Sequence, residues 1–309
     1  MTTEAKSLID ELDKTLSKAS ESQHLSILRR VTDLFLGEPE KFSGDHVAVF
    51  DDVIIRLVEK TGQPALIELS ARLAPVDNAP KNTVIRLSHD HDIAVSGPVL
   101  EKSNVLTEQT LVEVAKTKGQ KHLSAIAGRR RIGEAVTDLL VERGNSEVAC
   151  KVTGNQGARF SEPGFVKLVK RAKNDKTLAA AVEFIELPVN VIVRLSYDDD
   201  IAISGPILEK SDVLTNETLA EVAKAKGQKH LAAIAGRAQI AESVTDILAD
   251  RGNSEVACKM AGNKGAHISE LGFVKLINKA KSDKVLAATI AKRTDIPSEL
   301  EPFLKLALA

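Results

Sequence analysis

The chain carries the same helical block twice in tandem. From Asn82 onward it aligns without a gap on the segment that begins at Asn190, and about two-thirds of the aligned positions are identical. Repetition at a fixed spacing indicates a repeat architecture, in which each unit buries its apolar face against the next. The block is about 108 residues long, so the repeat constrains the fold of most of the 309-residue chain. The identity says less about function, because a recent duplication leaves neutral positions identical too.

Within each block, apolar residues recur at helical spacing between residues that start or stop helices. In the first block Thr107 can cap a helix that Gly119 ends. Pro98 is expected to kink or restart an earlier helix near Gly97, because proline removes a backbone donor. Other side chains suited to helix N-caps are Asp92, Asn145, Ser161 and Asp175. The pattern predicts six or seven short helices per block, and therefore stacked hairpins of about 36 residues.

One segment reads at first as a strand. Asn190-Val-Ile-Val is β-branched, but its counterpart at Asn82 opens a helical stripe that includes Leu87, so we assign helix to both. β-branched alternation is rare elsewhere, and a sheet is hard to place. The sequence therefore predicts an all-α protein: an α-solenoid, a superhelix of stacked helical hairpins like HEAT repeats, with a tandem duplication.

Four regions follow from these patterns. Residues 1–80 form an N-terminal helical region with amphipathic helices whose apolar stripes begin at Leu8, Leu28, Phe50 and Leu66. The two repeat blocks occupy residues 81–189 and 190–297. Residues 298–309 supply a last helix, which is expected to cap the exposed apolar face of the final repeat.

The composition limits which residues can form the core and in which environment the chain is expected to work. With no Trp, one Tyr and eight Phe, the core must be built from Leu, Ile, Val and Ala. The formal net charge of −1 gives no bulk attraction to nucleic acid or to anionic membranes. The first residues are acidic and lack a secretory signal, and no stretch reaches the roughly 18 apolar residues that span a bilayer. We therefore expect a cytoplasmic protein that has no membrane partner.

Two groups of residues that could carry metal or redox chemistry are weak candidates. Cys150 and Cys258 occupy equivalent positions, which should lie far apart in a solenoid, so we expect two small buried hydrophobes and no disulfide. The run His89-Asp90-His91-Asp92 becomes Tyr197-Asp198-Asp199-Asp200 in the second block, and consecutive helical residues point in different directions. We interpret this run as a solvated helix start, and expect neither a metal nor a cofactor.

The most chemically suggestive segment follows a glycine break. Lys121, His122 and Arg129 recur in the second block as Lys229, His230 and Arg237. The free N–H groups of a helix start, together with Lys and His, could hold a phosphate or a carboxylate. In the alternative interpretation, which we favour, His122 bonds a backbone carbonyl and Arg129 pairs with a carboxylate of a neighbouring repeat.

A dense basic run lies at the end of this segment. Arg129-Arg130-Arg131 becomes Arg237-Ala238-Gln239 in the second block. A surface that tracks phosphates should extend over both blocks, so this difference weakens a nucleic-acid interpretation.

Several strings resemble a known bacterial family. The chain reads DIAVSGPVLEKS, GQKHLSAIAGR, VTDLLVERGNSEV and GARFSEPGF, and closes with R-x-D-I-P at residues 293–297. These strings resemble an uncharacterised bacterial family known only as a domain of unknown function, whose members resemble HEAT-type and leucine-rich-variant helical repeats. The resemblance covers most of the chain from about Leu25 and implies a fold, but no activity or ligand.

Three hypotheses about function remain open. In the first, the chain is a non-catalytic scaffold or adaptor for a protein or peptide partner in bacterial regulation. In the second, it is a regulator that binds nucleic acid, a nucleotide or an anion through the Lys-His-Arg clusters. In the third, it is a helical-repeat enzyme, such as a glycosylase or lyase. The scarcity of aromatic residues argues against the last two, because bases are usually held by stacking, and we expect no enzyme activity.

Overall fold

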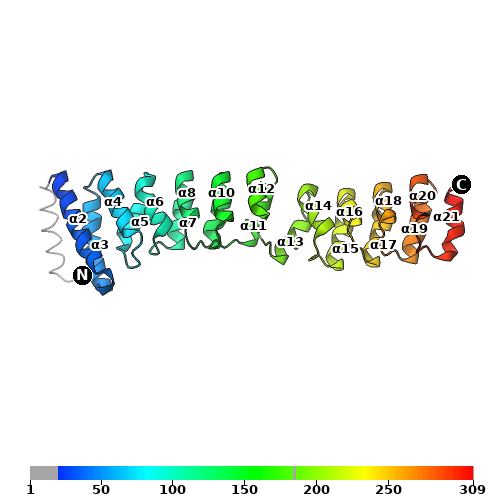
Figure 1. Cartoon of the computed structure of the whole chain (residues 1–309), viewed down its shortest axis with the longest axis horizontal. Helices are drawn as coiled ribbons and strands as arrows, with labels where there is room; N and C mark the ends of the chain where they lie inside the picture. Colours follow the sequence, from blue (N-terminus) through cyan, green and yellow to red (C-terminus); the bar gives the residue numbers. More distant parts are fainter. Residues whose placement is uncertain (1–19, 184–185, 309) are drawn as a thin grey trace. The chain divides into compact units, whose positions relative to one another are not determined.

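The computed structural model describes residues 20–183 and 186–308, which fold into α-helices joined by short loops (Figure 1). The apolar stripe predicted at Leu8 lies outside the described residues. Within them, the extended pairings are two isolated parallel bridges, Ile132 with Ala158 and Ile240 with Ala266. The predicted all-α solenoid is confirmed.

Two compact units divide the chain, at residues 1–185 and 186–309. The first contains α2 (Glu21–Gly37), a 3₁₀ turn (Pro39–Lys41), α3 (Gly44–Val58), α4 (Gln63–Leu73), α5 (Lys81–Ser88), α6 (Ile93–Lys102), α7 (Glu108–Thr117), α8 (Gln120–Ala127), α9 (Glu134–Arg143), α10 (Ser146–Thr153), α11 (Glu162–Ala172) and α12 (Lys176–Val182). The second contains α13 (Val189–Ser196), α14 (Ile201–Lys210), α15 (Asn216–Ala225), α16 (Gln228–Ala235), α17 (Glu242–Arg251), α18 (Ser254–Gly262), α19 (Glu270–Ala280), α20 (Lys284–Ile290), a 3₁₀ turn (Ser298–Leu300) and α21 (Glu301–Leu308). The Asn190 segment is thus helical, as predicted.

The helices of each unit form two layers. In the first unit α2, α4, α6, α8, α10 and α12 each contact the next member of one layer, and α7, α9 and α11 do the same in the other (Figure 1). In the second unit α14, α16, α18 and α20 form one layer, and α15, α17, α19 and α21 form the other. A helix therefore packs against its hairpin partner and against helices two places away in the chain.

The hairpins are shorter than the sequence pattern predicts. Their first helices begin 26 to 28 residues apart, at Lys81, Glu108, Glu134, Glu162, Val189, Asn216, Glu242 and Glu270. The predicted length of about 36 residues is wrong because each block holds eight helices, where the pattern predicts six or seven. The restart predicted at Pro98 does not occur, because α6 continues through this residue. Gly97 precedes the proline and has no Cβ to clash with its ring, so the helix need not restart.

Aliphatic side chains fill the core of each unit, as the composition predicts. Leu123, Ile126, Leu231 and Ile234 are all fully buried between layers. Aromatic packing is concentrated in the N-terminal region, where the ring of Phe35 lies 5.8 Å from Phe42 and 5.2 Å from Phe50. The predicted N-caps form, and Thr107 Oγ1, for example, accepts from the backbone N–H of Thr110 at 3.2 Å.

The loops after α8 and α10 are held together by backbone hydrogen bonds. Ile132 donates to the carbonyl of Gly157 at 3.0 Å, and Arg159 donates to the carbonyl of Ile132 at 3.0 Å. Gly157 is required at this contact, because a Cβ there would lie 1.9 Å from the carbonyl oxygen of Arg130. The second block repeats the arrangement at Gly265. The two loops therefore form a fixed pair in each block.

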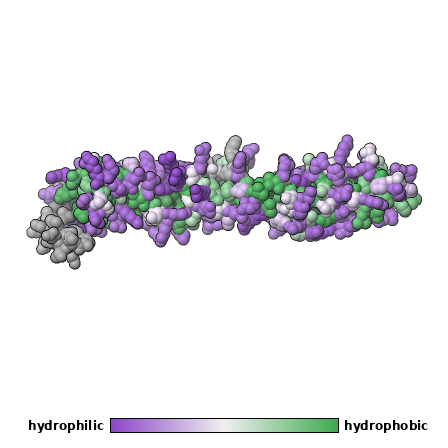
Figure 2. All heavy atoms as spheres, turned by 90° about the horizontal axis from the view of Figure 1, so that it is seen from below, coloured by the Kyte–Doolittle hydropathy of each residue, from purple (hydrophilic) through white to green (hydrophobic). Residues whose placement is uncertain are grey.

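Helix α21 packs on α19 and α20 at the C-terminal end. It buries Leu304 and Ala307 and leaves Phe303 53 % and Leu306 76 % exposed. Figure 2 shows hydrophilic side chains over most of the visible surface of each unit, with apolar side chains among them. Among the described residues, no helix combines the length and the apolar character needed to cross a membrane.

Candidate functional site

His122 and His230 are buried and bonded to the backbone. His122 lies in the first turn of α8, is 7 % exposed, and places Nε2 3.0 Å from the carbonyl oxygen of Asp90. His230 is equally buried and places Nε2 2.9 Å from the carbonyl oxygen of Asp198. Each histidine thus ties the start of one helix to the residues that precede the neighbouring helix of the same layer.

Arg129 and Arg237 bind the C-terminal ends of helices. The guanidinium of Arg129 donates from Nη1 to the carbonyl of Leu100 at 2.5 Å and from Nη2 to that of Ser103 at 2.7 Å. Arg237 makes the equivalent bonds, at 2.6 and 2.8 Å, to the carbonyls of Leu208 and Ser211. These carbonyls have no partner within their own helix, so the arginines act as C-caps supplied by the next hairpin. The expected carboxylate partner of Arg129 is replaced by these two carbonyls.

The three residue types are not brought together into one cluster. The shared helix face predicted for His122 and Arg129 does not form, because α8 ends at Ala127, and the two side chains bond to opposite ends of α6. Lys121 and Lys229 are exposed at the helix starts. A binding role for these six residues stays a prediction, and their geometry assigns four of them to holding neighbouring hairpins together.

The acidic run before α6 serves local structure. Asp92 caps the helix through the N–H of Ala94 at 2.9 Å, and Asp90 Oδ1 accepts from the N–H of Asp92 at 2.9 Å. Chiefly through burial, the pKa of His89 lies below its ordinary value. Across residues 20–183 and 186–308, no three His, Cys, Asp or Glu side chains are placed to share a metal ion.

The cysteines are free and half-buried, where full burial was expected. Burial is the main cause that raises the pKa of both thiols, and Asp175 near Cys150 and Asp283 near Cys258 act in the same direction. The thiolate, which is the reactive form, is therefore disfavoured at both positions.

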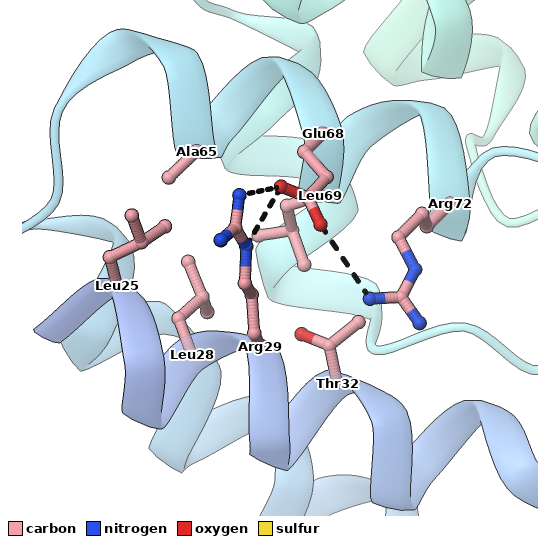
Figure 3. Close-up of a pocket in the computed structure, with 8 residues that line it drawn as sticks. All are labelled: Leu25, Leu28, Arg29, Thr32, Ala65, Glu68, Leu69 and Arg72. Carbon is pink, nitrogen blue, oxygen red and sulfur yellow. Dashed lines mark hydrogen bonds and ion pairs between the residues drawn. The ribbon is translucent and has the colours of Figure 1, made fainter.

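A small surface pocket lies between α2 and α4. Glu68 sits between Arg29 and Arg72, with 2.7 Å between Arg29 Nη2 and Glu68 Oε2 (Figure 3). Arg72 also reaches Asp33 at 2.6 Å. The pocket between these helices has a volume of only about 10 Å³. It is a packing feature in which the arginines are paired with carboxylates.

A larger groove opens beside the paired loops of the first block. It has a volume of about 640 Å³ and is lined by Leu106, Glu108, Leu111, Arg129, Arg131, Ile132, Gly133, Gln156, Gly157 and Arg159. We call it the arginine groove. Arg131 and Arg159 are exposed there, and within the described chain no hydrogen bond or ion pair engages either guanidinium.

The sequence pattern points to Arg131 as part of a basic run but misses Arg159. Their positions are far apart in the sequence, and the two loops meet through the bridge between Ile132 and Ala158 and through the side chain of Asn155, which donates to the carbonyl of Arg129. The available signal was the glycine at residues 157 and 265, combined with an arginine in one block and a histidine, His267, in the other.

Comparison with protein families identifies the fold unit. A model of the family described as an uncharacterised protein conserved in bacteria, DUF2336, matches residues 95–195 and again residues 203–301. The chain belongs to this family and contains its domain twice. No curated protein matches the chain. The resemblance inferred from the sequence is therefore confirmed.

Proposed function

We propose that the chain is a non-catalytic binding protein, a scaffold or adaptor that engages a protein or peptide partner in bacterial regulation. The observation that carries this proposal is the set of bonds made by the histidine and arginine side chains that the sequence marks as most suggestive of chemistry. His122 and Arg129, with His230 and Arg237, bond to backbone carbonyls of the neighbouring hairpin. Their chemistry serves the stacking of repeats, and stacked repeats present the extended surfaces that such proteins use for binding.

The surface of the two layers is suited to a protein partner. Exposed side chains of both charges occur on the helices of each unit, and within a unit each hairpin adds one more row to the surface. An extended partner can be bound along several hairpins, with each hairpin contributing a few contacts. In this proposal the protein works in the cytoplasm.

A nucleic-acid regulator remains the second candidate, and the same geometry disfavours it. Of the six residues predicted for such a role, only Lys121 and Lys229 are fully exposed. Phosphate contacts supply most of the non-specific affinity for nucleic acid, and two separated lysines supply little of it. No specific observation favours an enzyme.

The test is capture followed by reconstitution. The full chain is used as bait in a bacterial lysate, and each retained protein is then purified and titrated into the chain by calorimetry. We expect one protein to bind saturably, with hydrogen-exchange protection on exposed faces of several successive helices. Failure of every purified protein to bind would contradict the proposal, as would a salt-dependent shift of DNA or RNA.

The control variant is Lys121→Glu with Lys229→Glu. It reverses the two exposed charges without touching the histidine and arginine bonds, so the fold should be retained. Loss of nucleic-acid binding in this variant would favour the second candidate, whereas a retained protein complex supports the scaffold.

A further inference from the structure

We propose that the arginine groove of the first block is a binding site for a phosphomonoester group. The site goes beyond the scaffold role, because a scaffold requires no such group. The groove is lined by Arg129, Arg131 and Arg159 with one carboxylate, Glu108. The phosphate can be carried by a phosphorylated side chain of a partner or by a free nucleotide.

The backbone of the paired loops places the two exposed arginines on one side. Ile132 pairs with Ala158 in a parallel bridge, and side chains alternate between the two faces of such a pairing. Ile132 is buried, so Arg131 and Arg159 lie on the opposite face, and both line the groove. The positions beside them on that face are Gly133 and Gly157, which also line the groove.

The charge of the groove matches a phosphate better than a carboxylate. Three guanidinium groups and one carboxylate leave a formal charge of two positive units. A phosphomonoester carries roughly −1.5 to −2 near neutral pH and offers three strong acceptor oxygens, whereas a carboxylate carries only −1. The planar forks of Arg131 and Arg159 can each donate two hydrogen bonds to such oxygens.

Arg129 adds a buried positive charge beneath the groove. It is 7 % exposed, and its Nε has no hydrogen-bond partner although Nη1 and Nη2 both donate. Burial lowers the pKa of this guanidinium, and both of its hydrogen-bond partners are neutral backbone carbonyls. A buried charge without a counter-ion is costly, and an anion bound in the groove would reduce that cost.

The second block lacks this combination at the equivalent positions. Gln239 and His267 stand where the first block has Arg131 and Arg159. Asp212 replaces Asn104 and opposes the effect of burial on the pKa of Arg237. Lys264 stands at the position of Gln156, so the formal charge of the equivalent lining residues is the same in the second block, but one guanidinium stands there in place of three.

Two further positions of the groove also carry different residues in the two blocks. A Cβ at Gly133 would lie 2.1 Å from Oε1 of Glu108. The second block has Ala241 at the position of Gly133, and the smaller, neutral Asn216 at the position of Glu108. The glycine and the carboxylate are thus exchanged together with the arginines.

The experiment titrates the full chain with four probes at low ionic strength: a phosphoserine peptide, the same peptide unphosphorylated, AMP and inorganic phosphate. We expect the phosphorylated probes to bind and the unphosphorylated peptide not to bind. The variant Arg131→Gln with Arg159→His, which installs the residues of the second block, should weaken binding by about tenfold or more. Tighter binding of the peptide than of AMP identifies a protein source, and the reverse identifies a nucleotide.

The matched control is Lys121→Gln with Lys229→Gln, which removes the same charge away from the groove and should bind as the wild type does. Circular dichroism should show the same helix content for both variants. Independently of any variant, the Nε–H resonances of Arg131 and Arg159 should shift on adding phosphate, and that of Arg237 should not. The proposal is overturned if no phosphorylated probe binds, or if the groove variant binds as tightly as the wild type. Neither result would bear on the capture experiment for a protein partner.

Discussion

The two repeat blocks hold the same backbone with the same bonds and differ where they meet solvent beside the paired loops. His122 and Arg129 make the bonds that His230 and Arg237 make, to within 0.1 Å. Five positions of the arginine groove, in contrast, carry different residues in the second block: Glu108, Arg131, Gly133, Gln156 and Arg159. The comparison teaches that the family domain separates the residues that stack hairpins from those that give each copy its own surface.

The largest effect is expected where both blocks need the same glycine. Gly157→Ala and Gly265→Ala should each lower the free energy of unfolding by about 3 kcal/mol, because the new Cβ would overlap a carbonyl oxygen of the paired loop. The measurement is chemical denaturation of each variant. Gly44→Ala is the control, since a Cβ there meets nothing within 4 Å and the residue is the first of helix α3, so it should not lower the stability. A much smaller loss of stability at one of the two loop glycines than at the other would show that the two blocks are not equivalent there.

The arginine caps should cost less than the glycines when removed. Arg129→Ala and Arg237→Ala each leave two carbonyls at a helix end without their donors, so we expect a loss of about 2 kcal/mol in either block. Lys121→Ala, on the exposed start of the same helix, should change stability by less than about 0.5 kcal/mol. Thermal and urea unfolding would report the difference. Unchanged stability of Arg129→Ala together with lost binding would instead make this arginine a ligand-contacting residue.

The sequence predicted the parts of the fold that depend on local signals. Cap residues such as Thr107 and the apolar stripes predicted the helices, and two copies predicted a solenoid. Hairpin length was misjudged because helices of seven or eight residues carry only about two turns of pattern. Arg159 was missed because a contact between loops depends on tertiary packing, which no local period reports. His122 was predicted to bond a carbonyl, and does.

A smaller effect should distinguish the two surfaces. Arg131→Gln with Arg159→His removes two like charges that line the same groove, so stability should rise by about 0.5 kcal/mol at low ionic strength and by less at high salt. Gln239→Arg with His267→Arg in the second block should act in the opposite direction. Denaturation at two salt concentrations measures both. Equal responses that do not depend on salt would show that charge does not distinguish the blocks.

The smallest effects concern one position, which carries Tyr197 in the second block and His89 in the first. The pKa of the tyrosine is raised and the pKa of the histidine is lowered. Burial, and secondarily the hydrogen bond to Glu221 at 2.6 Å, raises the pKa of Tyr197 to about 12. The contribution of this contact to stability is therefore present below pH 10 and is lost as the pH rises towards about 12. Absorbance at 295 nm reports it directly, because Tyr197 is the only tyrosine. A midpoint near 10 in the folded protein would contradict this arrangement.

The equivalent residue of the first block is His89, whose pKa is lowered mainly by burial. Its neutral form is favoured in the folded state, so its contribution is present above pH 6.5 and is lost as the pH falls. An NMR titration of the His89 ring should give a midpoint below 6.5. The variant His89→Tyr removes the titrating imidazole and should therefore abolish the loss of stability at acidic pH.

The side chains that cap the C-terminal ends of these helices all come from later in the chain. Arg129 caps the end of α6, Arg143 the end of α7, Asn155 the end of α8 and Arg293 the end of α18. A hairpin leaving the ribosome is thus left with unsatisfied carbonyls until the next hairpin has been synthesised. Deletions from the C-terminus should consequently damage the last remaining hairpin, whereas deletions from the N-terminus leave these bonds in place.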